Sequence, residues 1–138
     1  MILLDTDTFT LLRWGPNAVT TRAAAAKDVL FITVVTRIEV LRGRFEALMK
    51  AADGVQLQQA LGRLIESERE LEALRQVSIT DGSAAEFDRL RQNKRLKKIG
   101  RADLLIASIA LANQATLVSR NLRDFRLVPG LQVENWAD

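Results

Sequence analysis

Cysteine, histidine and tyrosine are absent from this chain of 138 residues. Without cysteine the protein can form no disulfide, no thiolate nucleophile and no cysteine-ligated zinc site. Without histidine it has no imidazole ligands for a metal and no base for a Ser-His-Asp triad. Any chemistry must therefore rest on carboxylates, hydroxyls, lysine or arginine, and carboxylate oxygens favour hard cations such as Mg²⁺ or Mn²⁺.

Long apolar runs are also missing. The longest apolar stretch, Leu104–Ala112, is too short to span a bilayer. Met1 leads directly into Ile2–Leu4 with no basic segment before it, so a signal peptide is not expected. We therefore expect a cytoplasmic protein with no membrane partner. The length and a hydrophobic content of 48% predict one globular domain over residues 1–138.

Short apolar runs alternate with stretches of helical periodicity along the chain. Strands are predicted at Ile2–Leu4, Leu30–Val34, Val77–Thr80, Thr116–Val118 and, as an edge strand, Leu131–Glu134. This alternation predicts an α/β protein with a mainly parallel central sheet of four to five strands. Neither a glycine-rich dinucleotide-binding loop nor a phosphate-binding loop motif occurs.

Two predicted helices leave alternatives open. Thr36 is placed to cap the helix after the second strand, and Glu39 then has the spacing of a capping box, in which it would only reach back to the backbone of Thr36. The segment from Leu57 to Leu74 has the pattern of one or two long amphipathic helices. Its inner residues would pack either on the protein's own sheet or against a partner helix: Leu57, Leu61, Leu64 and Leu71.

Three more acids stand near predicted strand ends. Asp5 directly follows the first strand, Asp124 lies in the polar loop after the fourth, and Asp103 opens the apolar helix before the fourth strand. Taken singly, Asp103 could be only a helix cap and Asp124 only a turn residue. Ligands of parallel sheets bind beyond the carboxyl ends of the strands, where strand order reverses. If the first and fourth strands are central neighbours, Asp5 and Asp124 meet there, and Glu39 and Asp103 reach the same place from flanking helices.

Four converging carboxylates would repel one another unless cations bind or their pKa values rise. A divalent metal explains such an arrangement. Just before Asp103, the stretch from Arg89 to Arg101 holds seven basic residues and no acid. This basic stretch is either a solvated helix end or a contact surface for a polyanion.

Four short motifs occur in order along the chain: Leu3–Asp7, Thr36–Val40 with Gly43 after it, Gly100–Ala107 and Ser119–Phe125. With the closing segment Val128–Trp136, they resemble the PIN-domain nucleases, and most closely the VapC-like toxins of bacterial toxin–antitoxin pairs. Each motif is weak alone, but four in order, spread over effectively the whole chain, are specific.

The resemblance implies a three-layer α/β/α PIN-like fold and a Mg²⁺- or Mn²⁺-dependent endoribonuclease. By motif, the catalytic and metal-binding acids fall on Asp5, Glu39, Asp103 and Asp124. Polar residues expected to support them are Thr6, Asp7, Ser119 and Asn121. Asp7 stands where the family often has asparagine, and Ser119 where it often has threonine. The implied partners are an RNA substrate, a small VapB-like antitoxin and a second copy in a homodimer.

The expected mechanism is hydrolysis of RNA phosphodiester bonds by metal-activated water. Because the chain has no histidine, a 2′-hydroxyl route with paired imidazoles is not available, and we expect 5′-phosphate and 3′-hydroxyl ends. Residues expected to hold the RNA backbone are Lys94, Arg95, Lys97, Lys98, Arg101, Arg120 and Arg123. The alternatives are a PIN-type nuclease in RNA maturation and a non-catalytic PIN-like binding module, and four clustered acids count against the latter.

Overall fold

The computed structural model describes the backbone of residues 1–138 and every side chain except that of Asp28. One parallel sheet is formed by β1 (Ile2–Leu4), β2 (Leu30–Thr33), β3 (Arg75–Val77), β4 (Thr116–Val118) and β5 (Gln132–Glu134). Its order is β3-β2-β1-β4-β5, so β1 lies in the centre with β4 beside it. Strand order therefore reverses between β1 and β4. This is the condition under which the sequence predicts that Asp5 and Asp124 meet.

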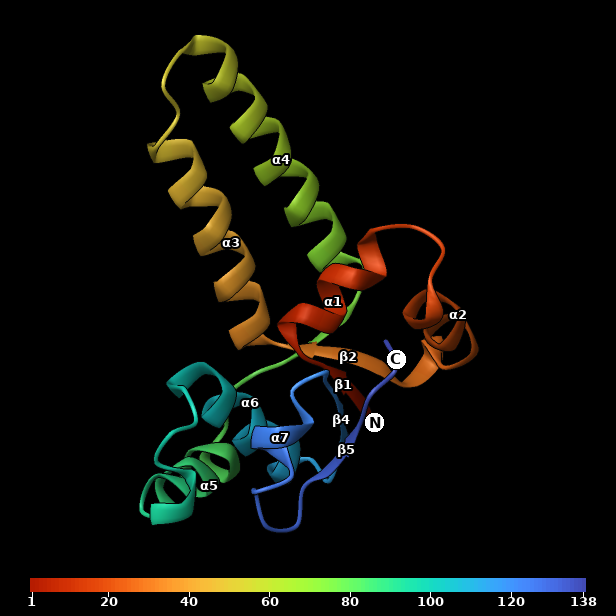
Figure 1. The fold of residues 1–138 in the computed structure, drawn as a ribbon, viewed down its shortest axis with the longest axis vertical. Helices are drawn as coiled ribbons and strands as arrows, with labels where there is room; N and C mark the ends of the chain where they lie inside the picture. The colour runs from red at the N-terminus through yellow and green to blue at the C-terminus, as the bar shows by residue number, and fades with distance from the viewer.

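Helices cover both faces of the sheet (Figure 1). They are α1 (Thr6–Arg13), α2 (Ala18–Ala25), α3 (Val34–Met49), α4 (Gly54–Glu72), α5 (Asp81–Arg91), α6 (Arg101–Ala112) and α7 (Leu122–Phe125), with 3₁₀ turns η1 (Lys27–Val29) and η2 (Lys94–Leu96). Successive strand residues point to opposite faces. Leu3 and Leu117 pack with α5, α6 and α7, whereas Leu4 and Val118 pack with α1 and α2. The predicted three-layer α/β/α fold is confirmed.

Helices α3 and α4 form a hairpin that projects away from the sheet (Figure 1). At its base Leu71 is buried in the core, with 1% of its surface exposed, so this leucine packs on the protein itself. Farther out Leu57 and Leu61 are nearly half exposed, and Leu64 is intermediate. Other large apolar side chains exposed on the hairpin are Ile38, Phe45, Met49, Val55 and Ile65.

None of the helices in the described part of the chain is long and apolar enough to cross a membrane.

Three local predictions are wrong. The side chain that caps α3 is Thr33, which accepts a hydrogen bond from the Thr36 N–H, so the helix begins earlier than predicted and Thr36 lies inside it. The third strand is Arg75–Val77 rather than Val77–Thr80, because Thr80 instead caps α5. The polar loop after β4 contains the short helix α7, which Asn121 caps.

Candidate active site

Asp5 lies at the carboxyl end of the central strand. Its N–H donates to the carbonyl of Val118 at 3.0 Å, and its Oδ1 accepts the N–H of Thr8 at 2.9 Å as the cap of α1. Only 6% of its surface is exposed. Burial raises the pKa of Asp5, hydrogen bonds from Ser119 and Thr8 oppose that rise, and the charge of Asp7 adds to it. The fold thus holds a buried carboxylate where strand order reverses.

Glu39 faces the same region from α3. The hydroxyl of Thr6, at the start of α1, donates to Glu39 Oε1 at 2.6 Å and lies 3.1 Å from the hydroxyl of Thr36. The interpretation in which Glu39 only reaches back to the Thr36 backbone is therefore wrong. Sequence reasoning did not identify Thr36 as a neighbour of the acids. The signal was its position three residues before Glu39, which places both side chains on one face of a helix.

Asp103 and Asp124 share one amide group. Asn121 Nδ2 donates to Asp124 Oδ2 at 3.1 Å and to Asp103 Oδ2 at a longer 3.4 Å. Asp103 lies in the first turn of α6, and Asp124 lies in α7 just beyond β4. Asn121 therefore joins the start of α6 to the end of β4, and it brings together two of the four predicted acids.

The pKa of Asp103 reports on all four acids. Burial is the main cause that raises this pKa, and the negative charges of Asp5, Glu39 and Asp124 raise it further. The hydrogen bond from Asn121 acts in the opposite direction. A carboxylate at the start of a helix is normally favoured, but here burial and three like charges outweigh that benefit. The site thus carries more negative charge than it stabilises by itself.

The donor set fits a hard divalent cation. Within the described side chains, no three carboxylates lie close enough to one another to form a ready-made metal site. Mg²⁺, however, is usually held by only one or two carboxylates and keeps several waters. Asp103 and Asp124 provide such a pair, and Asp5 and Glu39 add negative charge nearby.

The predicted supporting residues differ in their placement. Ser119 is fully buried, and its Oγ accepts the N–H of Asn121 at 2.9 Å, which helps fix the loop that carries Asn121. Thr6 and Asn121 donate directly to acids of the site. Asp7 is exposed on α1 and acts on Asp5 through its charge. The basic residues predicted to hold RNA are all exposed: Lys94, Arg95, Lys97, Lys98, Arg101, Arg120 and Arg123.

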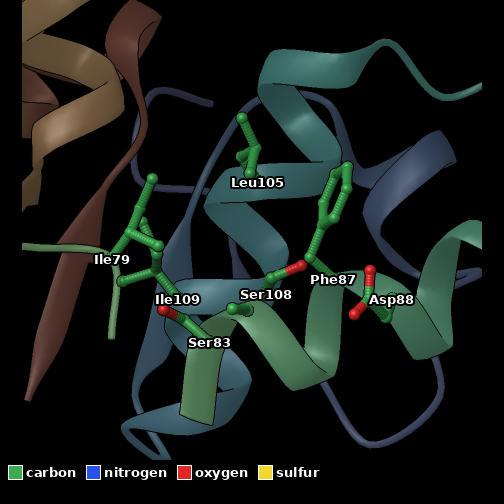
Figure 2. A pocket seen from close by; sticks show the side chains of 8 residues that line it. Ile79, Ser83, Phe87, Asp88, Leu105, Ser108 and Ile109 are labelled. Carbon is green, nitrogen blue, oxygen red and sulfur yellow. The ribbon is translucent and has the colours of Figure 1, made fainter. Parts of the chain in front are cut away.

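Two hollows near these elements have different characters. The pocket in Figure 2 lies between α5 and α6, has a volume of about 150 Å³, and is lined by none of the four acids. Its serine hydroxyls, on Ser83 and Ser108, already donate to backbone carbonyls in or next to their own helices. A groove of about 330 Å³ between α1 and α3 instead contains Thr6 and Glu39. Of these two hollows, only the α1–α3 groove reaches the acids.

Asp103→Asn is expected to raise the melting temperature at neutral pH in a buffer without divalent metal. Because the folded-state pKa of Asp103 is raised, the charged form is disfavoured in the folded protein, and the substitution removes that destabilising charge. As the pH falls through the raised pKa, wild-type Asp103 takes up a proton and the gain shrinks; it vanishes below the ordinary value of 3.8. Thermal melts of both proteins from neutral to acid pH measure this, and a gain independent of pH contradicts it.

Comparisons with known proteins identify a family and similar structures. The model of the PIN domain family matches residues 2–131. Ribonuclease VapC2 of Rickettsia felis is 55% identical over 38 residues, an alignment that covers only 28% of either protein. The crystal structure of VapBC2 from Rickettsia felis bound to a DNA fragment from their promoter superimposes with a TM-score of 0.78 and 25% identity, over 99% of each chain. The crystal structure of DNA-bound VapBC from Salmonella typhimurium superimposes with a TM-score of 0.78 and 22% sequence identity. The match covers 98% of this chain and 97% of that one.

Proposed function

The chain belongs to the PIN domain family, and from that membership we propose that it is a Mg²⁺- or Mn²⁺-dependent endoribonuclease, acting as the toxin of a toxin–antitoxin pair. The observation that carries the proposal is geometric: Asn121 donates to both Asp103 and Asp124, and the negative charges of Asp5 and Glu39 also raise the pKa of Asp103. The similarity to Ribonuclease VapC2 and to solved VapBC structures supports the same activity. A non-catalytic binding module would have no reason to hold four acids together against their repulsion.

The cation would be held by Asp103 and Asp124, with Asp5 and Glu39 completing the negative site. When bound, it would polarise the scissile phosphate and lower the pKa of an attacking water. The chain's own groups keep the acids oriented: Asn121 donates to Asp103 and Asp124, and backbone N–H groups and hydroxyls hold the other two. Such supporting hydrogen bonds fix the direction in which carboxylate oxygens point.

The substrate chemistry follows from charge. Exposed lysines and arginines before α6 and in the segment 119–125 would bind the phosphates of a single RNA strand, while the acids stand at the start of α6. We expect the products to carry 5′-phosphate and 3′-hydroxyl ends. Incubation of the purified chain with end-labelled single-stranded RNA and Mg²⁺ tests this: internal cuts with those ends support the proposal, and intact RNA contradicts it.

An inhibitor is required if the protein is a toxin. We propose that a small VapB-like protein packs a helix on the exposed apolar residues of the α3–α4 hairpin, which include Leu57 and Leu61. An arginine or lysine of that inhibitor would enter the site and pair with its carboxylates. We further propose that residues 1–138 form one domain, that two copies pair as a homodimer, and that the protein acts in the cytoplasm, where its RNA substrate is found.

Expression of the chain alone is expected to arrest growth, because uninhibited RNA cleavage would stop protein synthesis. Co-expression of a small protein encoded beside it is expected to restore growth, and the two proteins should co-purify. Colony counts with and without induction measure the effect, and the Asp103→Asn variant is the control that should not arrest growth. If growth is untouched and no small protein co-purifies, the toxin role fails and RNA maturation becomes the better assignment.

A further inference from the structure

A second pocket lies at the amino end of α6, on the side that faces α5. It has a volume of about 210 Å³. It is lined by Phe87, Leu90, Arg91, Leu96, Lys97, Ile99, Arg101 and Leu104, and we call it the basic pocket. We propose that the basic pocket binds one unpaired nucleobase of the RNA, next to the bond that is cut. This inference rests on the proposed function and adds a recognition site to it.

The charge of the basic pocket selects an anionic ligand. Its lining includes three cations, Arg91, Lys97 and Arg101, and no carboxylate. All three are exposed, and they belong to the basic stretch from Arg89 to Arg101, which contains seven basic residues and no acid. The neighbouring pocket in Figure 2 shares Phe87, but its lining contains Asp88 and no cation; Asp88 lies 4.0 Å from Arg91 of the basic pocket. A polyanion is therefore directed to the basic pocket and away from that neighbour.

The inner surface of the basic pocket suits a flat, apolar group. Leu90, Leu96 and Leu104 are buried, and Phe87 is only partly covered. The guanidinium of Arg101 lies 5.3 Å from the centroid of the Phe87 ring. Proteins that bind unpaired RNA stack its bases on aromatic rings and on arginine planes. Because Arg101 covers one face of the Phe87 ring, a base would stack on the outer side of this pair.

The size of the basic pocket limits what can enter it. Pockets for drug-sized ligands have volumes of roughly 300–1,000 Å³. At about 210 Å³ the basic pocket is smaller, so it has room for one small group and not for a folded peptide segment. Together with the cations at its rim, this favours a single base whose flanking phosphates remain outside on Arg91, Lys97 and Arg101.

The position of the basic pocket links it to cleavage. Arg101 and Leu104 are three residues apart in α6, so they share one face of the helix, whereas Asp103 points from the same first turn toward Asn121. A strand of RNA that crosses the start of α6 therefore meets the acids and the basic pocket side by side. The base held in the pocket would be next to the scissile phosphate, and the pocket would influence which base is preferred there.

The test measures RNA binding in EDTA, so that no cleavage is needed. Fluorescence anisotropy would compare Phe87→Leu, which keeps apolar volume but removes the aromatic face, with Phe31→Leu in β2. Phe31 is also partly buried, and Arg75 lies 5.9 Å from the centroid of its ring. Stacking on one aromatic ring contributes about 1–3 kcal/mol per base, so Phe87→Leu should weaken binding about five-fold or more. The control variant should bind like the wild type. Equal affinities of the two variants would overturn the proposal.

A second arm keeps the test independent of how well the variant folds. RNAs that lack one base, at each position in turn, would be bound to the wild type, and loss of one base should weaken binding far more than loss of any other. In Phe87→Leu that position should no longer stand out. By contrast, Lys97→Gln with Lys98→Gln should reduce the salt dependence for every RNA alike. If no position stands out in the wild type, the pocket does not bind a base. The binding pattern does not depend on cleavage. It would therefore support a base-binding pocket even if the protein did not cut RNA.

Discussion

RNA cleavage is expected to fall by more than about 100-fold when Asp103 or Asp5 is replaced by asparagine, because the loss of a residue that only supports a metal ligand already costs about 10- to 100-fold. Asp5 and Asp103 are two of the four acids of the candidate site. Asparagine keeps the size of each side chain while it removes the charge. The fold should survive, because asparagine caps a helix about as well as aspartate does at the position of Asp5. Cleavage assays on labelled RNA, with circular dichroism of each variant, measure both expectations.

Asp53→Asn provides a matched control for Asp5→Asn. Asp5 and Asp53 both cap a helix, and each accepts the N–H of the residue three positions later at 2.9 Å. Asp53 stands at the tip of the α3–α4 hairpin, away from the acids (Figure 1). Its substitution should leave cleavage unchanged. If Asp5→Asn and Asp103→Asn also cut RNA at the wild-type rate, the site assignment is wrong.

Removal of divalent metal is the second change with a large expected effect. Cleavage should stop in EDTA and return when Mg²⁺ or Mn²⁺ is added, because the site offers only oxygen ligands and hard cations prefer them. Addition of NaCl to the same ionic strength should not restore cleavage. Full activity in a preparation stripped of divalent metal would contradict the proposed chemistry.

Metal binding also has a readout that does not depend on RNA. A cation that binds the folded protein raises its melting temperature, and the rise grows with the logarithm of its concentration relative to its Kd. Mn²⁺ should therefore raise the melting temperature of the wild type, which carries the repelling acids, by more than that of Asp103→Asn. Equal shifts in the two proteins would mean that the ion binds elsewhere.

The sequence predicts most of the sheet because its central strands are short, apolar and clearly bounded. β1 and β4 occur at the predicted residues, and each is followed by a polar residue at the edge of the sheet. α6 is equally clear, since its apolar residues continue around nearly the whole helix and five of them are buried in the core. These elements carry or flank three of the acids, but their meeting at one edge depends on β1 and β4 being neighbours, which the structure shows and periodicity does not.

The remaining details depend on tertiary contacts that periodicity does not encode. The sequence does not fix the beginning of α3, because Thr33 and Thr36 both suit the capping position, and in the structure Thr33 caps the helix. The weak strand β3 has two exposed residues, so its pattern gave the wrong residues. The hydrogen bond from Thr6 to Glu39 joins two helices that are distant in sequence. The catalytic role of the four acids stays a prediction, because the structure joins only Asp103 and Asp124 through Asn121, and Asp5 and Glu39 act on Asp103 through their charge.

The central claim, that the four acids make this chain a ribonuclease, is tested most directly by mapping RNA ends in cells. The wild type and Asp103→Asn would be expressed briefly at equal levels, and all RNA 5′ ends that carry a monophosphate would be sequenced. We expect new 5′ ends at discrete positions in the wild-type sample and none of these in the variant. No new ends with the wild type, or the same ends with both proteins, would contradict it.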